Sequence, residues 1–190
     1  MNKTFDNKIL NATIIKIFGL SMEKMLNVRP TSEPMIREHD IIESNGYMRL
    51  FAMGKFNSPC YLSALNFYLS DKDQQDERPV GTMALYIKED VMEKFLQAID
   101  RVDVKPDEGL LSDICAEICN TVAEDIRTEL AVMGYPSLLI SSPIKSKNNA
   151  PAGAKFNYDL YKMQEIVFTY WAKECIVIEA CLGALPLLKK

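Results

Sequence analysis

Hydrophobic residues recur every three or four positions in three stretches of the chain, and each stretch predicts a helix. The first covers residues 7 to about 28 and ends before Pro30. The second covers residues 91 to 99, with Asp90 as its N-cap. The longest covers residues 110 to 133 and ends at Met-Gly-Tyr-Pro, because glycine suits a C-cap and proline cannot continue a helix. Its apolar positions follow at four-residue steps: Leu110, Ile114, Ile118, Val122, Ile126 and Leu130.

Runs that mix apolar residues with β-branched and aromatic residues predict the strands. They lie at residues 48–56, 61–69, 80–87, 165–170 and 175–182. The charged stretch 70–79 is expected to be a connection, and the stretch 145–155 a polar loop. Short connections between strands favour antiparallel pairing. We therefore predict one domain over residues 1–190 with an α+β fold, in which long helices pack on a mostly antiparallel sheet.

Composition narrows the classes of partner. The chain has 190 residues, 22 basic against 26 acidic side chains and a formal net charge of -4. The basic residues are scattered, so no stripe attracts a phosphate backbone and nucleic acid is not an expected partner. The apolar runs are far shorter than the ~20 residues of a membrane span, and no leader pattern begins the chain. We expect no membrane partner and a cytoplasmic protein.

The five cysteines do not form a recognisable metal or disulfide pattern. They are odd in number and lie among apolar residues, where small buried thiols are common. Cys115 and Cys119 share a helix face, but His39 is the only histidine and no second close cysteine pair exists. A tetrahedral metal site would lack ligands, so we expect none.

One face of the longest predicted helix carries an unusual polar set, which we call the polar ridge: Asp113, Glu117, Asn120 and Glu124. At ~100° per residue these four positions fall within about 60° of one another, opposite the apolar stripe. Such a face is expected on any amphipathic helix, and the pattern alone favours a solvated surface.

Two features of the polar ridge point beyond a solvated surface. Asn120 lies in the middle of the helix, where asparagine competes for backbone hydrogen bonds and has no capping role. Glu117 and Glu124 flank it, and we identify no cation on the same ridge to offset their repulsion. These features indicate that something other than helix stability selected the residues.

The segment "DICAEICN", residues 113–120, resembles the signature helix of the CheC, CheX and FliY family of chemotaxis phosphatases. The stretch "VGTMALYIKEDVMEKFLQAI" before it is similar to that family's strand and helix, and "GYPSLLISSPIK" after it to the family's return to the sheet. The closing "QEIVFTYWAKECIVIEACL" resembles the final hairpin. The likeness in element order covers most of residues 7–185, and the single Glu/Asn pair matches the CheX branch best.

The resemblance implies a bacterial two-component signalling protein that hydrolyses the aspartyl phosphate of a CheY-like response regulator. Asn120 would hold the attacking water, and Glu117 would pair with the active-site lysine of the receiver domain. Asp113 and Glu124 would contact the partner at the rim. The resemblance implies no cofactor in this chain, since Mg²⁺ resides on the receiver, and it implies a homodimer in which sheets join.

One position departs from the family's pattern. The family often has a small residue, commonly Gly, four places after the Asn, whereas this chain has Glu124. A carboxylate there could block or repel the receiver, or pair with a cation of a particular partner. Glu23 and Asn27 have no motif around them, so we interpret them as helix surface and not as a second site.

Three hypotheses follow for function. The first is the CheX-like phosphatase, and the second is an inactive or weak CheC-like domain that binds receivers as a dimeric scaffold. The third is a domain that binds a small ligand in a groove, although we find no phosphate loop, metal motif or nucleophile with a histidine partner. The apolar C-terminal hairpin, with Ile176, Ile178 and Leu182, supplies either a dimer edge or the core.

Overall fold

The structure is a computed structural model that describes residues 5–98, 107–148 and 153–188. Its elements are, in order, α1 (Asn7–Leu26), β1 (Met35–Asp40), β2 (Glu43–Ser44), β3 (Tyr47–Met48), α2 (Ala52–Phe56), β4 (Cys60–Tyr68), α3 (Asp71–Gln75), β5 (Gly81–Lys88), α4 (Glu89–Ala98), α5 (Glu108–Val132), β6 (Leu139–Ile140), β7 (Ile144–Lys147), β8 (Lys162–Tyr170) and β9 (Lys173–Leu182).

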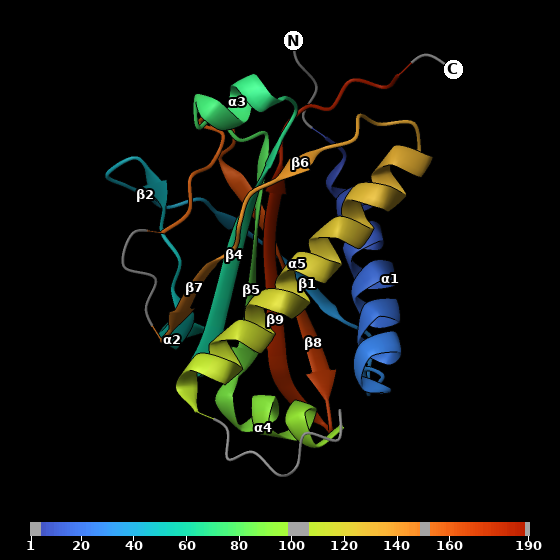
Figure 1. Cartoon of the computed structure of the whole chain (residues 1–190), viewed down its shortest axis with the longest axis vertical. Coiled ribbons are helices and arrows are strands. Elements are labelled where there is room, and N and C mark those ends of the chain that lie inside the picture. Colours follow the sequence, from blue (N-terminus) through green and yellow to red (C-terminus); the bar gives the residue numbers. More distant parts are fainter. Residues whose placement is uncertain (1–4, 99–106, 149–152, 189–190) are drawn as a thin grey trace.

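A seven-stranded antiparallel sheet forms the centre of the molecule, as Figure 1 shows. Its strand order is β1-β8-β9-β5-β4-β6, and β7 also pairs with β4. The helices α1 and α5 lie against one face and contact each other, with α5 running diagonally across the sheet (Figure 1). This arrangement confirms the predicted α+β class with long helices on an antiparallel sheet.

The larger hydrophobic core lies between α1, α5 and the sheet. The apolar stripe of α5 is buried there from Leu111 to Leu130, because residues four apart on a helix lie on one face. The side chain of Asp107 caps this helix by accepting a hydrogen bond from the backbone N–H of Leu110 at 2.7 Å. Burial of this stripe fixes which side of α5 faces solvent.

The first helix is shorter than its apolar pattern suggests. Asp6 caps its start by accepting a hydrogen bond from the Lys8 N–H at 2.8 Å. It ends at Leu26, because Asn27 adopts a left-handed conformation with φ 53° and donates its N–H to the Glu23 carbonyl. The apolar pattern, which continues to Val28, predicts a slightly longer helix.

A second, smaller core lies on the opposite face of the sheet, where α2 and residues 154–163 cover it. The predicted strand over residues 48–56 is wrong in this region. Met48, Leu50 and Ala52 alternate with exposed neighbours, but they bury themselves against the sheet face, and the segment then forms α2. Met48 belongs to the two-residue strand β3, whereas Leu50 and Ala52 show the two-residue period through burial alone, without strand pairing.

Three further segments differ from expectation. All six residues of β1 are exposed, so this edge strand had no two-residue pattern. The charged connection contains the short helix α3, whose Ser70 accepts a hydrogen bond from the Asp73 N–H. Residues 145–147 of the expected loop belong to β7, and residues 149–152 of that loop lie outside the described ranges.

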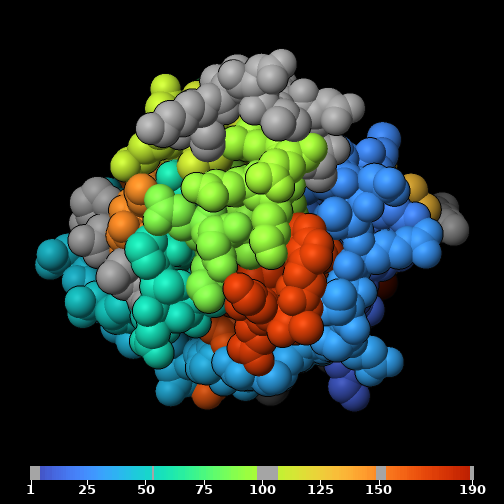
Figure 2. Space-filling model, turned by 90° about the horizontal axis from the view of Figure 1, so that it is seen from below, coloured from blue at the N-terminus to red at the C-terminus, as the bar shows by residue number. Residues whose placement is uncertain are grey.

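The helix predicted at 91–99 begins at Glu89, so Asp90 lies in its first turn and is not its cap. Ile99, which the pattern placed in the same helix, lies outside the described residues. Figure 2 shows this helix, α4, closing one end of the molecule beside the turn between β8 and β9. There the centroids of the Phe95 and Trp171 rings lie 5.9 Å apart.

The C-terminal hairpin supplies core and not an edge. The strand β9 lies between β8 and β5, and its Ile176, Ile178 and Leu182 are buried beneath the helices. The edges of the sheet are β1 on one side and β6 with β7 on the other.

Candidate functional site

The polar ridge lies on the solvent side of α5. Asp113 and Glu117 are exposed, and Asn120 and Glu124 are half-buried. They share one face because the apolar stripe of the helix is held against the sheet on the other. The structure thus brings the four predicted residues into one row on a rigid helix.

Two residues of the polar ridge are engaged in ion pairs within the chain. Lys145 of β7 reaches Asp113 with Nζ 2.5 Å from Oδ1. Arg127, one turn further along α5, lies with Nη2 2.5 Å from Oε2 of Glu124. The expectation that no cation on the ridge offsets the two glutamates beside Asn120 is therefore wrong for Glu124.

Glu117 differs from the other acidic residues of α5. Within residues 5–98, 107–148 and 153–188 it has no ion pair and no hydrogen-bond donor. Each of the other acidic residues has an ion pair or a hydrogen-bond donor: Glu108 with Lys147, Asp113 with Lys145, Glu124 with Arg127, Asp125 with Ser21, and Glu129 with Lys16. Among the described residues, Glu117 is thus the carboxylate of this helix that has no internal partner, and it can bind an external cation.

The Asn120 amide also has no partner in the described ranges. It forms no hydrogen bond to a described residue, and its polar atoms are not among the buried unpaired ones, so they face solvent. An amide offers both donors and an acceptor without net charge. Beside Glu117, it can therefore orient a water molecule near an anionic group.

The Glu23 and Asn27 pair serves the structure of α1. Asn27 is the left-handed C-cap of the helix, and Glu23 forms an ion pair with Arg29. The hydrogen bond from Arg29 lowers the pKa of Glu23. Both residues have local roles, in agreement with their interpretation as helix surface.

The opposite face of the sheet carries a second polar cluster, which was not predicted from the sequence. Lys55 of α2 lies between two buried glutamates that face each other across β8 and β9, Glu165 and Glu179. Their side chains are 12%, 7% and 1% exposed, respectively. Tyr86 donates its hydroxyl to Glu179. The sequence did contain a signal for this cluster, because each of the two glutamates interrupts an otherwise apolar strand.

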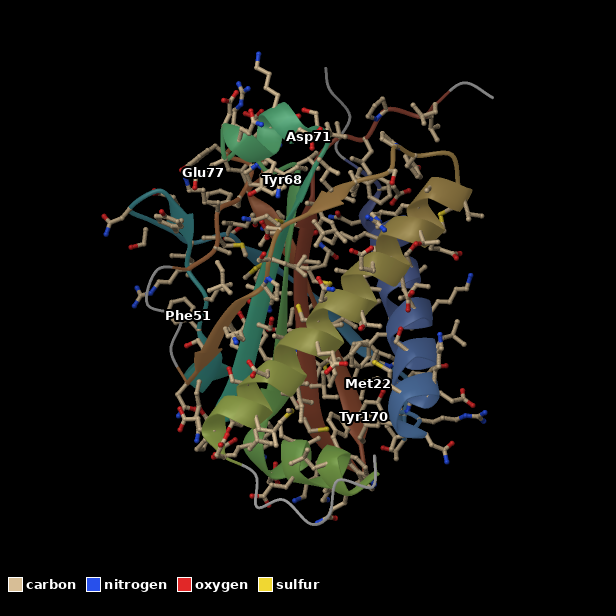
Figure 3. All side chains as sticks on the ribbon, in the orientation of Figure 1. Met22, Phe51, Tyr68, Asp71, Glu77 and Tyr170 are labelled. Atoms are coloured by element: carbon tan, nitrogen blue, oxygen red, sulfur yellow. The ribbon has the colours of Figure 1, made fainter. Side chains whose placement is uncertain are left out.

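A half-open pocket of about 290 Å³ borders this cluster, lined in part by Arg37, His39 and Phe51. Arg37 and His39 of β1 each approach the Glu165 carboxylate at 3.3 Å. Figure 3 shows Phe51 on the opposite side of the molecule from Met22 of α1. The pocket shares lining residues with the smaller core, so it opens on the sheet face opposite α5 and the polar ridge.

The opposite charges of the cluster stabilise one another and offset the cost of burial. Burial disfavours the charged form of Glu165, but hydrogen bonds and attraction from Lys55 and His39 outweigh it and lower the pKa of Glu165. Burial likewise disfavours charged Lys55, and the two glutamates more than offset it and raise the pKa of Lys55. Lys55 and Glu165 are therefore ionised at neutral pH.

Among the described residues, no group of three or more His, Cys, Asp or Glu side chains is arranged to hold a metal ion. Cys115 and Cys119 are fully buried in the larger core. Burial raises the pKa of Cys119 to about 12, which makes it a poor ligand or nucleophile. In the same parts of the chain, no helix is both long and apolar enough to cross a membrane.

The sequence matches no family model and no curated protein. Solved structures do match over most of their length. Thermotoga maritima FliY has a TM-score of 0.58 at 14% identity, covering 97% of this chain and 93% of its own. Vibrio vulnificus chemotaxis protein CheX has a TM-score of 0.55 at 14% identity, covering 89% and 95%.

A third match is the CheX-CheY-BeF3-Mg²⁺ complex of Borrelia burgdorferi, with a TM-score of 0.53 at 11% identity and coverage of 91% and 97%. The protein therefore has the α+β fold of the CheC-like class. Within that class it resembles the chemotaxis proteins CheC, CheX and FliY, as the sequence motif predicted. The matches do not separate the CheX branch from FliY.

Proposed function

We propose that this protein is a CheX-like phosphatase that accelerates hydrolysis of the aspartyl phosphate on a CheY-like response regulator. The observation that carries the proposal is that Glu117 and Asn120, three residues apart on the solvent side of α5, have no partner in the part of the chain that the structure describes, while the flanking carboxylates are paired. The structural likeness to a CheX solved with CheY supports the choice of partner.

In this proposal the protein contributes positioning and little else. A loose phosphoryl-transfer transition state needs an in-line water and charge stabilisation more than a strong base. Asn120 orients that water, and its neutral amide avoids the repulsion that a carboxylate would exert on the phosphoryl oxygens. Mg²⁺ belongs to the receiver domain, and this chain supplies no cofactor.

Glu117 docks the receiver in the proposed complex. Its carboxylate pairs with the receiver's active-site lysine, and the pair strengthens as the interface excludes water. Asp113 and Glu124 lie at the rim, where their ion pairs with Lys145 and Arg127 limit their repulsion of the phosphoryl group.

The proposal is tested by phosphate release from phosphorylated receivers of the source organism. Asn120→Ala should lower the accelerated rate on the order of 10²-fold, as loss of a positioned amide does in other active sites. Thr128→Ala, on the same helix, is the matched control and should retain activity. A parent protein that accelerates no receiver would overturn the proposal.

A second candidate is a CheC-like domain that binds receivers without turnover, and Glu124 favours it, because a carboxylate stands where the family commonly has Gly. Receiver binding that persists unchanged in the Glu117→Ala, Asn120→Ala double variant, with no turnover by the parent, would establish it. In either case we propose a cytoplasmic bacterial homodimer. Sedimentation as a monomer at micromolar concentration would contradict the dimer.

A further inference from the structure

Arg127 differs in charge from the acidic residues of α5. The helix sequence Glu108–Val132 contains six acidic residues and a single basic one, which is Arg127. Its guanidinium pairs with Glu124 three residues earlier, and the two side chains are 34% and 39% exposed. The pair therefore forms part of the surface that a partner on the polar ridge would meet.

The position of Glu124 makes its charge important. Residues four apart on a helix lie one above the other, with Cβ atoms about 6 Å apart, so Glu124 is the next ridge residue after Asn120. Side chains also lean toward the N-terminus of a helix, which directs Glu124 toward Asn120. Arg127 lies on the other side of Glu124 and holds its carboxylate at 2.5 Å.

We propose that Arg127 is a positioning residue of the proposed phosphatase site and acts through Glu124. The ion pair cancels the charge of that carboxylate and retains it away from Asn120, so that a dianionic phosphoryl group can approach. The inference rests on the proposed function. It explains how this chain can tolerate a glutamate beside its catalytic amide.

The expected size of the effect follows from distance. A free carboxylate one helical turn from Asn120, with about 6 Å between the two Cβ atoms, lies in surroundings between interior and bulk water and slows the approach of the phosphoryl group about 3- to 10-fold. Lys145→Gln provides a matched comparison, because it frees Asp113, which lies two turns from Asn120. At about 10 Å that charge is near the screening length at physiological salt, and the expected change is less than about 2-fold.

The test measures kcat/KM for dephosphorylation of an active receiver by the parent, Arg127→Gln, Glu124→Gln and the double variant. Arg127→Gln should lower kcat/KM about 3- to 10-fold. The loss should be smaller at roughly 0.5 M NaCl, because salt at this concentration screens charges over only a few ångströms. The Glu124→Gln, Arg127→Gln double variant should regain the activity lost in Arg127→Gln, because the released carboxylate is gone. Glu124→Gln alone leaves the Arg127 guanidinium unpaired and should raise kcat/KM, because that cation attracts the anionic phosphoryl group.

The outcomes separate this inference from the function on which it rests. An active parent with an equally active Arg127→Gln variant overturns the role of Arg127 alone. A loss that persists in the Glu124→Gln, Arg127→Gln double variant also overturns it, since Arg127 would then act on the receiver directly. A parent without activity on any receiver overturns the phosphatase proposal and this inference with it. Circular dichroism of each variant controls for folding.

Discussion

Replacement of Lys55 by methionine should destabilise the protein more than any exposed ion pair could. Methionine keeps the length and apolar volume of the side chain but removes the ammonium group between Glu165 and Glu179. Those carboxylates are 7% and 1% exposed and face each other across neighbouring strands. Like charges in this arrangement repel, and water cannot solvate them once the lysine is absent.

The magnitude follows from the burial of the partners. Removing one member of a buried ion pair costs roughly 3–5 kcal/mol. Arg37 and His39 remain near Glu165, and Tyr86 still donates to Glu179, so we expect about 3 kcal/mol. In a domain of this size that corresponds to a fall in Tm of about 6–12 °C.

Urea unfolding followed by circular dichroism measures this change, and Lys16→Met is the matched control. Lys16 pairs with Glu129 at 2.6 Å on the surface, and exposed pairs contribute about 0–1 kcal/mol. Adding Glu179→Gln to Lys55→Met should restore on the order of 1–2 kcal/mol by removing one buried charge. A loss below about 1 kcal/mol in Lys55→Met would show that the cluster does not depend on its lysine.

The same cluster predicts the direction of the pH dependence. The pKa of Glu165 is lowered from 4.5 in the folded protein. Its ion pair therefore contributes stability that is fully present above pH 4.5 and is lost as pH falls through the lower folded pKa. The difference between parent and Lys55→Met should shrink over that range, because Glu165 no longer needs the lysine once it is protonated.

Three further changes test the packing. Gly19 lies within α1, and no heavy atom lies within 4 Å of the place that an added Cβ would take. Gly19→Ala should therefore raise the free energy of unfolding by about 0.5–1 kcal/mol, measured by urea unfolding. A lower free energy of unfolding would contradict the open space around this position. Gly81→Ala should destabilise by about 1–3 kcal/mol, because its Cβ would lie 2.7 Å from the Cys181 carbonyl oxygen; an unchanged unfolding midpoint would refute this. All five thiols, Cys119 included, are buried and should react with Ellman's reagent only in denaturant, so labelling in the folded state would disprove their burial.

The helix that carries the candidate site was predictable because its signal is local. The apolar residues from Leu110 to Leu130 fix both the helix and its buried side, and the polar ridge follows from helix geometry. The Glu124 and Arg127 pair was also accessible from three-residue spacing, although it was not predicted. Glu117 and Asn120 as functional residues remain predictions.

Other features depend on tertiary contacts that spacing does not reveal. Lys145 meets Asp113 only because β7 pairs with β4 beside α5. Lys55 meets its glutamates because α2 folds over the second face of the sheet. The edge strand β1 was missed for a different reason, because both of its faces are exposed and hydrophobic periodicity reports burial alone.

The two edges of the sheet differ in how well they could pair with a strand of another chain. On one side the backbone is divided into the short β6 and β7, with Pro143 between them, which has no N–H to donate. On the other side β1 presents six consecutive exposed residues. Strand addition is therefore favoured at one border only. Two copies joined there through a two-fold axis would use up that border in both, so growth would stop at a closed pair and would not continue into a fibre.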